Sequence, residues 1–150
     1  MSKLSPLDDV QSRIMMEECW SIKSECKNWF PAPIYEWVKR HSTILGVPDE
    51  YLALPLLVAT AHLSHHSHVK INRMYKEPII IYSIVAGRSG TNKSGSLSLI
   101  ADIVEELKPD SIFDSGTIEG LAKSLESNKG NVVSINDEFA NFMDDLYNGT

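Results

Sequence analysis

Residues 87–94 form a short stretch, GRSGTNKS, whose glycines and polar side chains suit phosphate binding. The phosphate-binding loop (Walker A) pattern is G-x-x-x-x-G-K-[ST], and Gly87, Lys93 and Ser94 match it. In such a loop, backbone N–H groups and the positive end of the following helix dipole surround the phosphates. We expect Lys93 to reach the β- and γ-phosphates and Ser94 to ligate Mg²⁺. The expected nucleotide-binding residues are Gly87, Arg88, Ser89, Gly90, Thr91, Asn92, Lys93 and Ser94.

Asn92 stands where this pattern has its second glycine. Asn is the non-glycine residue that best tolerates a left-handed backbone, so we expect the loop to close, with the Asn92 side chain crowding the phosphates. Gly87 and Gly90 are expected to let the backbone curl without a Cβ in the way. The alternative interpretation is an ordinary Gly/Ser-rich turn between a strand and a helix, in which Lys93 and Ser94 are incidental.

A second chemical feature is the pair Asp137-Glu138, which directly follows the apolar stretch NVVSIN at 131–136. Carboxylates at the carboxyl end of a strand lie where open α/β sheets bind ligands. We expect Asp137 to hold Mg²⁺, directly or through water, and Glu138 to orient and deprotonate an attacking water, as a Walker B pair does. Glu138 and Lys93 are therefore the expected catalytic residues. Alone, acidic residues after a strand often mark only the start of a helix.

The pattern of residues 79–136 predicts the elements that would position these groups. The apolar run 79–86 predicts a strand covered on both faces, which leads into the loop and then into a helix over 93–107. Residues 111–114 predict a second strand, 118–128 an amphipathic helix, and 131–136 a third strand. This alternation predicts an α/β fold in which helices cover a parallel sheet.

The part before this core predicts helices. Residues 1–29 carry a loose apolar stripe that predicts one helical extension, in which Cys19 and Cys26 are buried thiols without a bridge. Prolines at 31 and 33 mark a boundary. A helix is expected from Pro33 to Gly46, and a buried, mostly apolar helix from Pro48 to about His65. We therefore divide the chain into an extension (1–29), a helical region packed on the core (30–68) and a P-loop core (69–150).

Two clusters between these parts have competing interpretations. His62, His65, His66 and His68 invite a metal site, but no acidic third ligand lies nearby, so a polar helix end with partly charged histidines is the favoured interpretation.

The second cluster lies on and after a short, half-exposed strand predicted at 69–72. Lys70, Arg73 and Lys76, with Tyr75 among them, could form a small nucleic-acid patch, although a solvated charged loop over 73–78 is the favoured interpretation.

The composition sets limits on the class of protein. A net charge of −6 over 150 residues excludes a surface that is basic all over. The N-terminus lacks the apolar core of a signal peptide, and no apolar stretch reaches the 18 or more residues of a spanning helix. We expect a soluble intracellular protein, cytoplasmic or nuclear, with no membrane partner.

From about Phe30 onward the chain resembles a P-loop family catalogued as domain of unknown function 3987, found among primase- and helicase-like proteins of phages, plasmids and other mobile elements. The resemblance rests on the order and spacing of loose motifs. These motifs are Phe30-Pro31, the helical stretch through Val47-Pro48-Asp49, the strand and loop ending at Ser94, Gly116-Thr117-Ile118-Glu119-Gly120-Leu121, and Asp137-Glu138-Phe139.

This resemblance implies a RecA-like ATPase with ATP and Mg²⁺ as cofactors, acting in DNA replication or transposition. DNA and further copies of the chain are the partners it implies. A RecA-like core normally continues with more strands after Asp137-Glu138, so we expect this chain to hold only the N-terminal part of such a core. The competing expectation is a truncated or catalytically degenerate P-loop module that serves as a protein-interaction domain.

Overall fold

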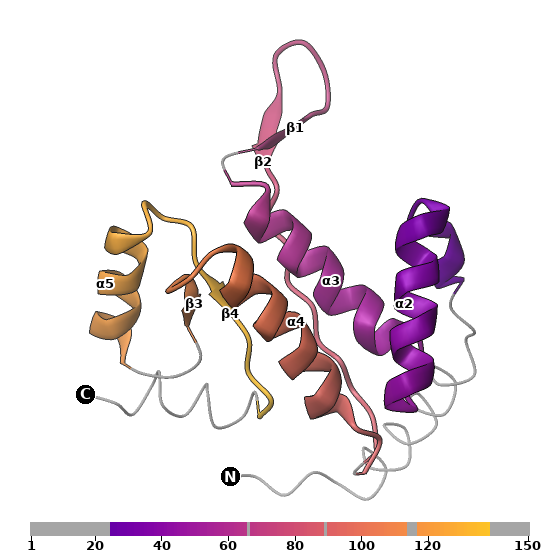
Figure 1. Ribbon diagram of the computed structural model, residues 1–150. Coiled ribbons are helices and arrows are strands. Elements are labelled where there is room, and N and C mark those ends of the chain that lie inside the picture. Colours follow the sequence, from indigo (N-terminus) through magenta and orange to yellow (C-terminus); the bar gives the residue numbers. More distant parts are fainter. Residues whose placement is uncertain (1–24, 66, 89, 114–116, 139–150) are drawn as a thin grey trace, which may run out of the picture.

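The computed structural model describes residues 25–65, 67–88, 90–113 and 117–138, which form a mixed α/β structure. Figure 1 shows two central helices, α3 and α4, side by side, with α2 and α5 at opposite sides and a β hairpin projecting away from the helices. In chain order the elements are η1 (Cys26–Asn28), α2 (Ala32–Leu45), α3 (Glu50–Leu63), β1 (His68–Lys70), β2 (Lys76–Pro78), α4 (Lys93–Leu107), β3 (Ile112–Phe113), α5 (Ile118–Ser127) and β4 (Val133–Ser134).

Helices α2 and α3 are joined by a tight corner. Gly46 ends α2 in the left-handed conformation (φ 68°), which glycine adopts without strain, and this confirms the predicted helix end. Asp49 then begins α3, and its carboxylate accepts hydrogen bonds from the Ser42 hydroxyl (2.5 Å) and the Tyr35 hydroxyl (3.0 Å) in α2. Burial alone would raise the pKa of Asp49, but these hydrogen bonds and the nearby Lys39 ammonium outweigh it and lower that pKa. Helix α3 ends at Leu63, two residues before the predicted end.

The hydrophobic core lies mainly where α3 packs against α4. Leu52 from α3 and Ile100 and Val104 from α4 are almost completely buried, at 0%, 1% and 0% exposure. The helix that begins at the glycine-rich loop is therefore held by the helical region before it. The buried members of this core are Cys26, Val38, Leu52, Ala53, Ala59, Ile100, Val104 and Val133.

The predicted strand–helix–strand unit over 111–136 is confirmed. Strands β3 and β4 are parallel neighbours, with Ile112 opposite Val133 and Phe113 opposite Ser134. Helix α5 connects them and begins at Thr117, whose hydroxyl accepts a hydrogen bond from the Gly120 N–H (3.2 Å). This connection places residues 135–138, which follow β4, alongside α4.

The strand predicted over 79–86 is wrong for the described structure. This segment pairs with no strand among residues 25–65, 67–88, 90–113 and 117–138, and it leaves Tyr82 and Ile84 at 91% and 72% exposure. Apolar side chains alone do not make a covered strand, because each edge also needs a neighbour to receive its N–H and C=O groups. The parallel sheet of the described residues therefore consists of β3 and β4.

The charged loop predicted over 73–78 is also wrong in part, because Lys76–Pro78 forms β2 and pairs antiparallel with β1. Other expectations fall outside the description: the helical extension at residues 1–24, including Cys19, and the helix expected after Glu138. In the described part of the chain, no helix has both the length and the apolar character to cross a membrane.

Candidate functional site

The glycine-rich loop reverses direction at two left-handed residues. Gly90 has φ 80°, and Asn92 has φ 55° and ψ 35°, directly before α4. The expectation that Asn92 would adopt the left-handed conformation is confirmed. Its side-chain amide donates a hydrogen bond to the backbone carbonyl of Leu45 at the end of α2 (3.0 Å), so the loop is tied to the helical region.

A side chain at Gly87 would meet Tyr51. Gly87 does not adopt a positive φ, but a Cβ built on it would lie 1.9 Å from the hydroxyl oxygen of Tyr51. Tyr51, in α3, lies against the start of the loop, and its hydroxyl is 3.4 Å from the Ala86 carbonyl oxygen. No local pattern predicts this contact, because Tyr51 precedes Ala86 by 35 residues.

The first turn of α4 presents its backbone N–H groups to the loop. Within the described residues, no side chain caps this helix, and its first turn contains no acidic residue. The first N–H groups of a helix have no partner inside it, and the positive end of the helix dipole lies there. This helix start is therefore suited to an anion such as phosphate.

The ammonium of Lys93 folds back over the loop. Its Nζ donates hydrogen bonds to the carbonyl oxygens of Gly87 (2.9 Å) and Arg88 (3.0 Å). The positive charge therefore lies within the curl of the loop, where two carbonyl dipoles orient it. A phosphate bound there would meet both this charge and the start of α4.

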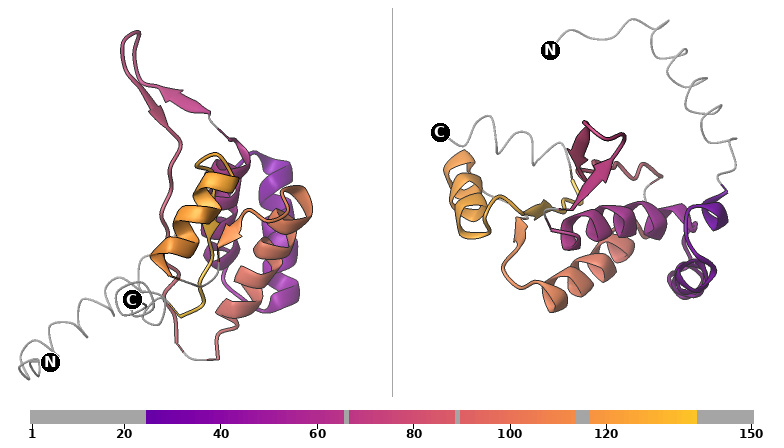
Figure 2. Two further views of the ribbon diagram at one scale, coloured as in Figure 1. Left: turned by 90° about the vertical axis from the view of Figure 1, so that its left-hand side faces the viewer. Right: turned by 90° about the horizontal axis from the view of Figure 1, so that it is seen from above.

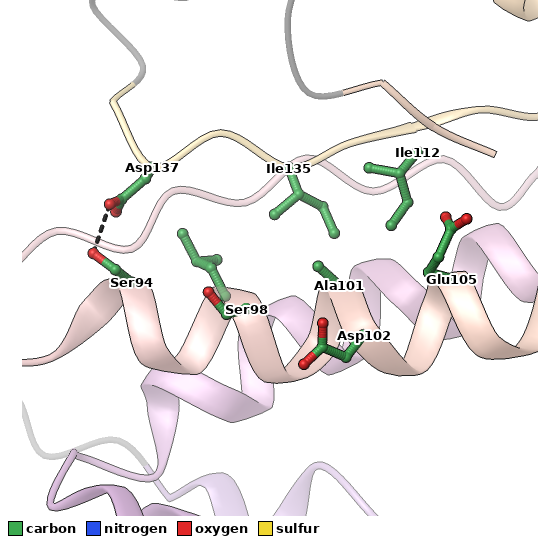
Figure 3. Close-up of a pocket in the computed structure, with 9 residues that line it drawn as sticks. Ser94, Ser98, Ala101, Asp102, Glu105, Ile112, Ile135 and Asp137 are labelled. Carbon is green, nitrogen blue, oxygen red and sulfur yellow. Dashed lines mark hydrogen bonds between the residues drawn. The ribbon is translucent and has the colours of Figure 1, made fainter. Parts of the chain in front are cut away.

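The two halves of the predicted site meet in one hydrogen bond. The Ser94 hydroxyl donates to Oδ2 of Asp137 at 2.6 Å, although the residues are 43 positions apart (Figure 3). Ser94 comes from the first turn of α4, and Asp137 from the segment after β4. The path of β4 past α4 thus brings the carboxylate to the start of that helix.

A hollow of about 370 Å³ opens beside this contact. It is lined entirely by residues that the sequence analysis assigned to the site, namely Gly90, Thr91, Asn92, Lys93, Ser94, Asp137 and Glu138. Asp137 and Glu138 are both exposed to solvent here. Because Asn92 also lines the hollow, crowding of a phosphate by its side chain stays a prediction.

A second hollow, of about 460 Å³, continues from Ser94 and Asp137 along α4. Figure 3 shows Ser98, Ala101 and Glu105 on this helix, facing Ile135 and Ile112. Its floor is partly apolar, while Asp102 and Glu105 make one wall acidic. A ligand in this part would meet apolar contacts and negative charge rather than phosphate-binding groups.

The donor set at the first hollow fits Mg²⁺. Magnesium prefers oxygen ligands at about 2.0–2.1 Å and is usually held by one or two carboxylates together with substrate phosphates, so neighbouring ligand oxygens lie about 3 Å apart. The Ser94 and Asp137 oxygens, at 2.6 Å, are close to that separation. Replacing their hydrogen bond by shared coordination would need only a small shift of either side chain.

The structure brings together most of the predicted site residues. Ser89 lies outside the described residues, and Arg88 takes part through its carbonyl. Besides Tyr51, sequence reasoning missed Gly95, where a Cβ would lie 2.6 Å from the side-chain oxygen of Asn92. The one feature of the sequence that could have predicted this contact is a residue without a side chain three positions after Asn92.

The histidines do not join this site. His62 is buried, and its Nε2 lies 2.8 Å from the Ser111 hydroxyl. Burial lowers the pKa of His62, and the nearby Lys108 charge adds to this effect. The prediction of a partly charged helix end is therefore wrong for His62. Among the residues described, no group of three His, Cys, Asp or Glu side chains is arranged to hold a metal ion.

No protein-family model, no curated protein and no solved structure matches the chain. The geometry of the loop, helix start and carboxylate pair therefore stands as the basis for any functional assignment.

Proposed function

We propose that this chain binds a nucleoside triphosphate with Mg²⁺ in the hollow between the loop at 87–94 and Asp137-Glu138. ATP is the nucleotide that the family resemblance implies. The proposal includes the P-loop, RecA-like character and the helicase- or primase-like role that the family resemblance implies. In this proposal the loop N–H groups, the start of α4 and Lys93 hold the phosphates. Ser94 and Asp137 hold the metal ion, which neutralises phosphate charge.

In this proposal Glu138 acts in hydrolysis rather than in binding. Its carboxylate lines the same hollow as Lys93 and Ser94, on the Asp137 side. A carboxylate within hydrogen-bonding reach of a water orients that water and accepts its proton as the new bond from the water oxygen to the γ-phosphorus forms. The bond between the γ-phosphorus and the bridging oxygen breaks in the same step, and the nucleoside diphosphate is the leaving group. Lys93 would meanwhile stabilise the negative charge on the transferred phosphoryl group.

One observation carries the proposal: the hydrogen bond between Ser94 and Asp137. If Lys93 and Ser94 were incidental residues of a turn, nothing would require the Ser94 hydroxyl to contact a carboxylate 43 positions later in the chain. Here the hydroxyl expected to ligate the metal meets the carboxylate expected to do the same, beside an uncapped helix start.

The second candidate function is a protein-interaction module built on a P-loop scaffold without turnover. The exposed apolar side chains of the 79–86 segment favour it, because Ile80, Tyr82 and Ile84 are 64%, 91% and 72% exposed. Exposed apolar surface of this kind often marks a contact with another protein.

The test is a thermal-shift titration with Mg-ATP, combined with a hydrolysis assay. A ligand at about 100 times its Kd stabilises the folded state by about 2.7 kcal/mol, roughly 5–10 °C in Tm for a chain of this size. Lys93→Ala should lose this shift because the phosphate charge is no longer countered. Glu138→Gln should keep the shift but stop phosphate release.

Lys123→Ala is the matched control, since this exposed lysine lies on α5. It should keep both the shift and the turnover of the wild-type chain. Equal nucleotide affinity in Lys93→Ala and wild type would contradict the assignment. The absence of any shift in wild type at millimolar Mg-ATP would favour the interaction module.

A further inference from the structure

The hairpin formed by β1 and β2 is an ordered arm that projects from the helices (Figures 1 and 2). Its strands pair from His68 opposite Pro78 to Lys70 opposite Lys76. At the tip, the Asn72 side-chain oxygen accepts hydrogen bonds from the N–H groups of Met74 and Tyr75, both at 2.9 Å. Asn72 thus fixes the turn, and the arm has a defined shape although all of its residues are exposed.

The pairing register gives the arm two unlike faces. Residues opposite each other in an antiparallel pair share a face, and successive residues alternate between faces. Lys70 and Lys76 therefore lie side by side on one face, with His68 two positions further along β1. Like charges placed directly opposite each other destabilise a strand pair, so this face is unfavourable for the arm alone. A bound anion between the two ammonium groups removes that penalty.

The other face and the tip are mainly apolar, with one carboxylate, Glu77, which lies opposite Val69 and accepts a hydrogen bond from the Tyr75 hydroxyl. Val69 lies on the face opposite the lysines, and the hydrogen bond from the Ile71 N–H to the Tyr75 carbonyl (3.1 Å) continues the register to the tip. Val69, Ile71 and Tyr75 are 51%, 61% and 51% exposed, and Met74 is 96% exposed. These side chains offer flat and flexible apolar surface next to the cations.

The charge of the arm contrasts with that of the chain. Residues 67–78 contain three cations, Lys70, Arg73 and Lys76, and one carboxylate, Glu77, whereas the whole chain has a net charge of −6. A local excess of positive charge on an acidic protein attracts a polyanion to that place and not to the rest of the surface.

We propose that this arm binds single-stranded nucleic acid, with Lys70, Lys76 and Arg73 on the phosphates and Tyr75 and Met74 against the bases. A strand crossing the tip lays its backbone on the cationic face and its bases on the apolar face. Proteins that bind single strands combine these elements, a cationic track and an aromatic surface on which bases stack. The proposal does not depend on the nucleotide site, because the arm shares no residue with it.

A lipid surface is the competing polyanion, and Arg73 argues against it. A hairpin that inserts its tip into a membrane needs an apolar tip with the cations set back from it. Here Arg73 stands in the turn beside Met74, where insertion would carry its charge into the apolar layer.

The experiment measures fluorescence anisotropy of a labelled single-stranded DNA oligonucleotide of about 20 nucleotides, titrated with the full chain at several salt concentrations. With three phosphate contacts, the slope of log K against log salt should be about −2, and a fourfold rise in salt should weaken binding about 20-fold. In Lys70→Gln/Lys76→Gln the slope should fall to about −0.7, because two contacts are lost. Affinity at low salt should fall about tenfold or more. Tyr75→Ala should weaken binding without changing the slope.

The matched control is Lys27→Gln/Lys123→Gln, which removes the same charge from exposed lysines on η1 and α5. It should bind like wild type, and unchanged Tm values should show that all variants fold. Co-sedimentation with phosphatidylcholine–phosphatidylserine vesicles forms the second arm of the test. The proposal is overturned if wild type fails to bind the oligonucleotide, if both double variants lose affinity equally, or if arm-dependent binding occurs with vesicles alone.

Discussion

Asn92 occupies the loop position where the phosphate-binding pattern has glycine, and two of its interactions make this substitution tolerable. Its backbone is left-handed (φ 55°), a conformation that Asn adopts more readily than most residues. Its side chain bonds the Leu45 carbonyl, while Gly95 leaves room for the amide. The residue therefore holds the loop in shape and ties it to α2.

Replacing Asn92 separates these contributions. Asn92→Ala should destabilise the chain by about 2 kcal/mol, since it loses the hydrogen bond and puts a Cβ without a polar side chain in the left-handed region. Asn92→Gly should cost about 1 kcal/mol or less, because glycine adopts this conformation freely and only the hydrogen bond is lost. Urea unfolding at neutral pH measures both values. If Gly proved as damaging as Ala, the backbone conformation would not be the deciding factor.

At the residue scale, the sequence predicted the site better than it predicted the contacts that hold it. The spacing of Gly87, Lys93 and Ser94, and the carboxylates after an apolar stretch, were visible because a loop pattern and a strand end are local features. The contact of Tyr51 with Gly87 was not visible, because it depends on how α3 packs against the loop. No local pattern encodes a contact across 35 residues or more.

At the scale of elements, α4 is the helix on which the proposed site depends, and α3 holds it in place. Leu52 has 0% exposure and belongs to the same buried cluster as Ile100 and Val104 of α4. Deleting its side chain beyond Cβ leaves a cavity between elements that otherwise fit closely. The lost packing would weaken the support of α4, including its start at the proposed site, as well as the core.

Leu52→Ala should lower the free energy of unfolding by about 2–5 kcal/mol, the usual cost of removing a buried leucine. Leu107→Ala provides the control in α4, because Leu107 is 65% exposed and its truncation should change stability by about 0.5 kcal/mol or less. Chemical denaturation of both variants measures the difference. If both variants lost the same free energy of unfolding, the packing of α3 against α4 would not contribute the stability that we expect from it.

The elements also show where sequence patterns stop being informative. Helices α2 and α5 were predicted well because their ends carry local signals, Gly46 at one and Thr117 at the other. The strand over 79–86 was wrong because an apolar run reports side-chain preference and not whether a neighbouring strand exists. The hairpin was missed for the opposite reason: Lys76–Pro78 is polar, and its pairing with β1 comes from the Asn72 turn rather than from an apolar pattern.

At the scale of the whole molecule, His62 links the helical half to the parallel strands. It lies in α3 with 7% exposure, and its Nε2 contacts the hydroxyl of Ser111, directly before β3. Asn131, before β4, donates a hydrogen bond to the His62 carbonyl (3.1 Å) and contacts His65. Burial and the charge of Lys108 lower the pKa of His62 below its ordinary value of 6.5, so the folded chain takes up a proton at this imidazole less readily than the unfolded chain does.

This arrangement predicts how stability depends on pH. Below about pH 6.5 the unfolded chain takes up a proton at His62 that the folded chain resists, so the unfolded state binds more protons and stability falls as pH falls. The other resolved shifts act in other pH ranges. The lowered pKa values of Asp49 and Glu119 matter only below about pH 4.5. The raised pKa values of Tyr35 and Tyr75 and the lowered pKa of Lys108 matter in the alkaline range.

Urea midpoints at about pH 7.5 and about pH 5.5 should therefore differ, with the chain less stable at the lower pH. His62→Gln removes the titrating group and should reduce this difference, even if it lowers stability at both pH values by breaking the Ser111 contact. His68→Gln, at an exposed histidine in β1, should leave the difference unchanged. An equal pH response in wild type and His62→Gln would mean that protonation elsewhere sets the stability of the chain in acid.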